Sequence, residues 1–126
     1  MKQLLSILAG IFFLATCSFS QGIDYMECIK KTSSEWGGDC IQCPVKKDTY
    51  RVFLKNNCSE SVDVKIAVME TIGRFRTFTF SSVLPNDSVS GYACTGNGKY
   101  FFWAKKTGDK SLLFPDDEEI QRDYGN

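Results

Sequence analysis

Apolar and polar residues alternate with a period of two along much of this chain. The clearest run covers 62–69, where every second position is apolar: Val62, Val64, Ile66 and Val68. This alternation is typical of a strand with one buried face and one wetter face. Similar patterns predict further strands at 50–55, 74–80, 88–93 and 99–105, and an edge strand at 112–114.

Turn-forming residues separate these predicted strands. Asn97-Gly98 is a strong hairpin signal and predicts a tight turn between the strands at 88–93 and 99–105. In the strand at 74–80, Phe75 has the opposite parity from Phe78 and Phe80, so we expect a bulge that brings the three rings to one side. Short strands at regular spacing predict an all-β fold, a small antiparallel β-sandwich of five to seven strands.

The chain begins with the pattern of a secretory signal peptide at 1–20. A basic start is followed by a 12-residue apolar run at 4–15, which is shorter than the roughly 20 residues of a membrane-spanning helix. The small residues Ser18 and Ser20 predict cleavage after Ser20 and a secreted or periplasmic protein. The alternative is a lipoprotein anchored through Cys17. No later apolar run predicts a transmembrane segment.

Three segments follow the predicted leader. A Cys-rich N-terminal segment covers 21–48 and has weak helical spacing near Tyr25, the sandwich core covers 49–114, and an acidic tail covers 115–126. The acidic run 116–119 has four consecutive carboxylates without the spacing of a calcium loop, so we expect a solvated tail with one helical turn, and no metal or cofactor.

Composition excludes several classes of function. The 15 basic and 15 acidic residues balance, which gives no electrostatic footprint for nucleic acid. The chain has no histidine, so it lacks the commonest general base and the commonest metal ligand. A catalytic triad that relies on imidazole cannot be built from this chain.

Five cysteines follow the predicted leader: Cys28, Cys40, Cys43, Cys58 and Cys94. An exported domain of this size favours disulfides over zinc. We expect one disulfide between Cys58 and Cys94, at the ends of predicted strands, and a second from Cys28 to Cys40 or Cys43. One cysteine is left over.

The C-x-x-C pair of Cys40 and Cys43 raises the alternative of thiol–disulfide exchange. Such catalysts place the first thiolate at a helix N-terminus. Here the pair follows Gly37-Gly38 and precedes Pro44, which is loop composition. We therefore favour a structural role for these cysteines.

Residues 52–105 carry a longer pattern of core and turn residues. The pattern comprises Val52-x-Leu54-x-Asn56-Asn57-Cys58-Ser59, Val62-Asp63-Val64-x-Ile66-Ala67-Val68, Phe75, Phe78, Phe80, Leu84-Pro85-Asn86-Asp87 and Tyr100-Phe101-Phe102-x-Ala104. This order resembles the small domains grouped as DUF1036, a family of unknown function. Phe75 and Phe80 stand where that family has Trp, and Asn86 stands where it has Gly. The resemblance covers about half of the mature chain and implies a β-sandwich without implying an activity.

Three aromatic residues lie opposite the predicted core positions: Phe53, Phe101 and Trp103. Outward aromatic side chains can form a binding face for a sugar, a peptide or a partner strand. Alternatively, the N-terminal segment or 112–114 covers them. The sequence thus favours an exported, non-catalytic binding or envelope-associated domain with an unknown protein or glycan partner. The alternatives are thiol–disulfide exchange through Cys40 and Cys43, and an inhibitor or immunity-type partner of another secreted protein that uses Phe101 and Trp103.

Overall fold

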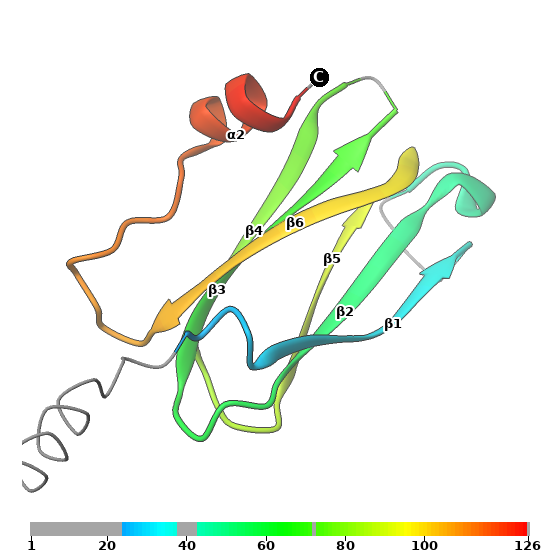
Figure 1. Cartoon of the computed structure of the whole chain (residues 1–126). Helices are drawn as coiled ribbons and strands as arrows, with labels where there is room; N and C mark the ends of the chain where they lie inside the picture. The colour runs from blue at the N-terminus through cyan, green and yellow to red at the C-terminus, as the bar shows by residue number, and fades with distance from the viewer. Residues whose placement is uncertain (1–23, 38–42, 72, 126) are drawn as a thin grey trace, which may run out of the picture.

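The computed structural model describes residues 24–37, 43–71 and 73–125, which form a β-sandwich of two three-stranded antiparallel sheets (Figure 1). One sheet has the order β1-β2-β5 and the other the order β4-β3-β6. The elements are β1 (Ile29–Trp36), the 3₁₀ turn η2 (Lys46–Asp48), β2 (Tyr50–Asn56), β3 (Val62–Glu70), β4 (Phe75–Val83), β5 (Ser88–Ala93), β6 (Gly96–Lys106) and α2 (Asp117–Tyr124). The all-β sandwich prediction is confirmed.

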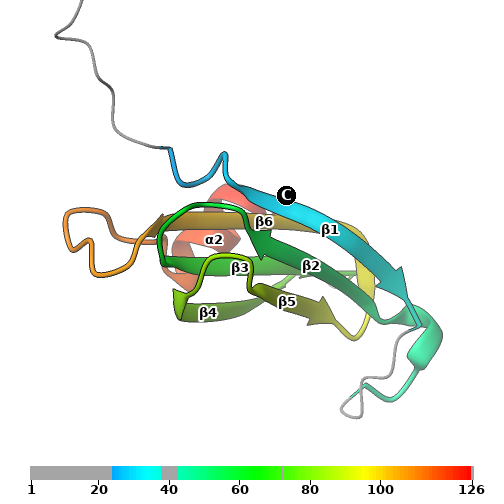
Figure 2. The ribbon, with the colours of Figure 1, turned by 90° about the horizontal axis from the view of Figure 1, so that it is seen from below.

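The core lies between the two sheets (Figure 2). Val52 and Leu54 of β2 face β3, whose Val62, Val64 and Ile66 are fully or almost fully buried. Burying side chains of this size stabilises the fold by about 1.5–3 kcal/mol each. The alternation in the sequence therefore marks the core-facing side of both central strands.

The connection between β5 and β6 differs from the predicted hairpin. β5 pairs with β2, whereas β6 pairs with β3 in the other sheet. Asn97-Gly98 lies inside β6, where the register shifts between Val68↔Tyr100 and Glu70↔Gly96. Gly98 has a φ of 86°, which glycine adopts at little cost. The hairpin prediction was wrong because the same backbone freedom serves a bulge within a strand.

The predicted bulge between Phe75 and Phe78 is also absent. Pairing with β3 is regular from Met69↔Phe75 to Val64↔Phe80, so Phe75 faces away from the core. The irregularity lies nearer the end of β4, where Ser82 has a φ of 55° and its N–H donates to Asp63 at 2.9 Å.

The N-terminal segment supplies an edge strand that the sequence pattern did not predict. Only Ile29 of β1 is buried, so the strand has no run of alternating apolar residues. Residues 112–114, predicted as an edge strand, form an irregular connection instead. They lead to α2, whose start is fixed by a capping box between Asp116 and Glu119.

Two disulfides join Cys28 to Cys58 and Cys43 to Cys94, so both predicted pairings were wrong. Cys58 follows one end of β2, while Cys94 lies beside the other end, where Tyr50 pairs with Ala93. The strand spans on the order of 20 Å, far beyond the reach of one disulfide. Cys40, like the predicted leader, lies outside the described residues.

Candidate functional site

The structure places the three predicted aromatic side chains on two different surfaces. Phe53 alternates with the buried Val52 and Leu54, so it lies on the outer face of the β1-β2-β5 sheet. Phe101 and Trp103 lie on the outer face of the β4-β3-β6 sheet. The two faces are on opposite sides of the sandwich, so Phe53 does not share a surface with the β6 pair.

The C-terminal helix α2 covers Phe101 and Trp103. The Tyr124 ring centroid lies 4.7 Å from that of Phe101 and 5.6 Å from that of Trp103. Ile120 of the same helix has no exposed surface. Helix α2 therefore covers part of this aromatic pair. Residues 112–114 lie beside it on the same outer face, since the ammonium of Lys105 donates to the carbonyl of Leu112 at 2.7 Å and lies 4.8 Å from the Phe114 ring centroid.

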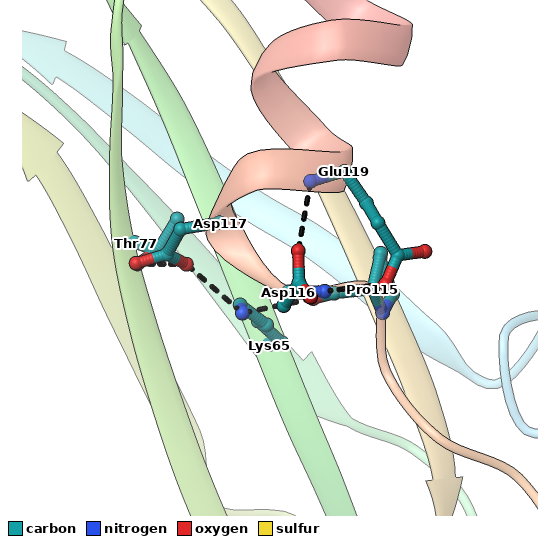
Figure 3. Close-up of polar contacts among 6 residues, drawn as sticks. All are labelled: Lys65, Thr77, Pro115, Asp116, Asp117 and Glu119. Carbon is teal, nitrogen blue, oxygen red and sulfur yellow. Dashed lines mark hydrogen bonds and ion pairs between the residues drawn. The ribbon is translucent and has the colours of Figure 1, made fainter.

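Polar contacts fix the start of α2 on the sheet (Figure 3). The ammonium of Lys65 lies 3.1 Å from Asp117 and donates to the carbonyl of Pro115 at 2.9 Å. The hydroxyl of Thr77 donates to the same Asp117 carboxylate at 3.0 Å. These hydrogen bonds, that from Lys65 first, lower the pKa of Asp117. We call these four residues the helix anchor.

An open depression of about 480 Å³ lies beside the helix anchor, lined by Lys65, Asp116, Asp117 and Glu118. Its acidic side chains are partly engaged, since Asp116 caps the helix and Asp117 pairs with Lys65. Among the described residues, no three Cys, Asp or Glu side chains are grouped so that they could hold a metal ion. The depression is thus explained by the docking of α2.

The opposite side of the sandwich carries a polar face with aromatic rings. Its residues are those that alternate with the core positions, and we call them the open face: Lys30, Ser33 and Glu35 of β1, Arg51, Phe53 and Lys55 of β2, and Ser88, Ser90 and Tyr92 of β5. All of them are exposed or partly exposed. Within the described ranges, no helix packs across this face, and α2 lies on the other sheet (Figures 1 and 2).

Positive charge dominates the open face. Lys30 lies directly opposite Lys55, and Glu35 lies opposite Arg51. In the part of the chain that the structure describes, no carboxylate lies within 4.0 Å of the charged nitrogens of Lys30, Arg51 or Lys55. These three cations are therefore available to a charged ligand.

One of these cations is held in place by an aromatic ring. The Arg51 guanidinium lies 5.5 Å from the Tyr92 ring centroid, and the Arg76 guanidinium lies 5.2 Å from the same centroid. Arg76 is also paired with Glu70 at 3.2 Å, and Glu70 accepts a hydrogen bond from Thr95. Arg76 thus has a carboxylate partner within 4.0 Å, whereas Arg51 has none among the described residues, although Glu35 is its register partner on β1.

Sequence reasoning found Phe53 but missed the residues around it. Arg51 and Lys55 follow from the alternation in β2, since they share its parity with Phe53. Lys30 belongs to the unpredicted β1, and Tyr92 joins the face only because β5 pairs with β2. The signal that could have found the face is the order cation, ring, cation at every second position of β2.

Comparisons with models of protein families, with curated proteins and with solved structures found no match. Among the described residues, no helix is long and apolar enough to cross a membrane.

Proposed function

We propose that this protein is an exported binding domain, stabilised by disulfides, that acts without catalysis and binds its partner through the open face. The observation that carries the proposal is the difference between the two outer sheet faces. Helix α2 packs against Phe101 and Trp103, whereas no helix of the described residues packs across the face on which Phe53 lies between Arg51 and Lys55. Uncovered aromatic and charged side chains are typical of binding surfaces.

Two observations support export to a secreted or periplasmic location. The segment 1–20 has the layout of a signal peptide with cleavage after Ser20. The two disulfides suit an oxidising compartment, because the cytosol keeps most thiols reduced. An intact mass of the exported protein distinguishes cleavage after Ser20 from a lipid anchor at Cys17.

The absence of histidine from the chain supports a non-catalytic role. The lowered carboxylate pKa values, of Asp109 and Asp117, have structural causes: Asp109 accepts hydrogen bonds from Ser111, and Asp117 belongs to the helix anchor. Neither carboxylate therefore carries the perturbation expected of a catalytic acid or base.

The two other functions that the sequence suggests gain less support. Cys43 is bonded to Cys94, so thiol–disulfide exchange with Cys40 as the partner would first have to break that bridge. An inhibitor surface built on Phe101 and Trp103 would be reduced in area, because both rings are partly buried and contact Tyr124 of α2. The resemblance to the DUF1036 domains stays a prediction about fold and adds nothing to the choice of partner.

A photo-crosslinking experiment tests the use of the open face. We would place benzoylphenylalanine at position 53 and, as a matched control, at Thr79, an exposed β4 residue that pairs with Lys65 on the other sheet. Each protein is incubated with the envelope and secreted fractions of its source cells. We expect a product from position 53 that is lost when Arg51 and Lys55 are replaced by serine. Equal products from positions 53 and 79 would contradict the proposal.

A further inference from the structure

We propose that the open face recognises an acidic polysaccharide, that is, a chain of sugars that carry carboxylate or sulfate groups. The inference rests on the proposed function, because it assigns a ligand class to the same face. The charges, the positions of the rings and the polar side chains of the open face support this ligand class.

Two like charges face each other on the open face. Lys30 and Lys55 are register partners on β1 and β2, which places their Cβ atoms about 5 Å apart. Like charges directly opposite one another destabilise a sheet. No described carboxylate lies within 4.0 Å of either ammonium. An anion bound between the two would relieve the repulsion.

Arg51 is the second feature that favours an anionic ligand. Its guanidinium lies 5.5 Å from the Tyr92 ring centroid, and Arg76 lies near the same ring. Because Glu70 neutralises Arg76, Arg51 is the guanidinium left to receive an anion. A guanidinium matches a carboxylate or sulfate with two parallel hydrogen bonds. Arg51 can therefore bind one anionic group while its guanidinium lies near the Tyr92 ring.

The cations of β2 are separated by a distance that suits a polymer with repeated charges. Residues on one face of a strand recur about every 6.7 Å, so Arg51 and Lys55 stand about 13 Å apart along β2, with Phe53 midway. This arrangement separates two anion-binding positions by one apolar ring. It suits an extended polymer with repeated charges, which contacts the ring with its uncharged parts.

The side chains of the open face favour a polysaccharide over a folded protein as the partner. The centre of a protein–protein interface is depleted in charged residues and rich in apolar contacts. The open face has no aliphatic side chain. Its rings, those of Phe53 and Tyr92, lie among three cations, the hydroxyls of Ser33, Ser88 and Ser90, and one carboxylate, that of Glu35, which stands at the end of the face away from Lys30 and Lys55. Hydroxyls and cations match the hydroxyls and anions of an acidic sugar chain better than they match a folded protein surface.

Binding to defined polymers tests the inference. The exported, disulfide-bonded protein is titrated calorimetrically with heparin, polygalacturonate, neutral dextran and poly-L-glutamate, at low and at high salt. We expect binding to heparin or polygalacturonate that weakens as salt rises, and none to dextran. Arg51→Ser and the double change Lys30→Ser with Lys55→Ser should each weaken binding about tenfold, the loss of one charged hydrogen-bonded contact.

A control variant on the other sheet shows whether an effect is specific to the open face. Lys99→Ser removes an exposed lysine of β6, in the other sheet, and should leave affinity unchanged. Binding to poly-L-glutamate as tight as to the polysaccharides would overturn the inference in favour of an acidic polypeptide. Binding that survives the open-face changes would also overturn it. If no acidic polysaccharide binds while position 53 still crosslinks a partner, the inference fails and the proposed function stands; if neither occurs, both fail.

Discussion

Replacing Ile120 by alanine should release α2 from the sheet without unfolding the sandwich. Ile120 has no exposed surface, and its burial contributes about 1.5–3 kcal/mol. The ring contacts of Tyr124 with Phe101 and Trp103 add about 0.5–1.5 kcal/mol each. An Ile→Ala change in a packed site costs about 2–5 kcal/mol, which is comparable to the apolar and aromatic part of the docking contribution, the helix anchor being left intact. Since ordering the helix also costs free energy, the variant should have α2 undocked in a large fraction of molecules.

Tryptophan fluorescence and hydrogen exchange measure this release. The chain has two tryptophans, Trp36 and Trp103. Trp36 is 53% exposed and is replaced by phenylalanine in all variants, so that the fluorescence comes from Trp103 alone. In Ile120→Ala, acrylamide should quench Trp103 more strongly, because its ring loses the cover of Tyr124. Protection of the α2 amides from exchange should fall by about 30-fold or more, while the amides of β3 keep theirs.

A matched variant separates docking from a general effect on the C-terminal segment. Leu113→Ala removes a similar aliphatic side chain that is 87% exposed, and it should change neither quenching nor exchange. The reasoning is refuted if Ile120→Ala behaves like Leu113→Ala, or if Ile120→Ala exposes β3 and α2 together.

Two further predictions concern charge and covalent structure. Because the hydrogen bond from Lys65 lowers the pKa of Asp117 in the folded protein, the ionised carboxylate stabilises docking of α2 above its ordinary value of 3.8, and this contribution is lost as the pH falls through the lowered pKa. Quenching of the single tryptophan should rise over that acidic range, and Asp117→Asn should remove this part of the pH dependence; a variant with an unchanged pH profile would contradict the helix anchor. Replacing Cys28 and Cys58 together by serine should lower the free energy of unfolding in urea by about 3–4 kcal/mol, the chain-entropy value for a separation of 30 residues. A non-reduced peptide map should show Cys28 joined to Cys58, and a peptide that joins Cys58 to Cys94 would show the assigned pairing to be incorrect.

The strands at the centre of each sheet could be predicted because apolar residues recur at every second position along them, although burial itself is periodic only in β2 and β3 is buried on both faces from Val64 to Met69. β2 and β3 alternate between core and outer face, so parity along the chain is enough to identify Phe53 as an outward residue. β1 could not be predicted in this way, since an edge strand with one buried residue has no apolar period. A strand that lies between two others in its sheet can therefore be predicted from its local pattern, whereas an edge strand such as β1 cannot.

Sheet membership and disulfide pairing depend on contacts between distant segments. Asn97-Gly98 satisfies a local hairpin rule, yet β5 and β6 join different sheets. The cysteines pair as they do because β2 runs from one end of the sandwich to the other, which separates Cys58 from Cys94. The open face could be found only in part, because Lys30 and Tyr92 reach it through pairings that lie far apart in the sequence.

The two disulfides have a consequence for how the chain matures. Their loops interleave: Cys43 lies inside the segment closed by Cys28–Cys58, and Cys58 lies inside the segment closed by Cys43–Cys94. Under the export proposed above, the chain crosses a membrane from its N-terminus and can complete the first bridge before Cys94 emerges, and during that interval Cys43 has Cys40, three residues away in the sequence, as a competing partner. Oxidative folding should therefore pass through a species with one native bridge, and an enzyme that reshuffles disulfides should speed formation of the second.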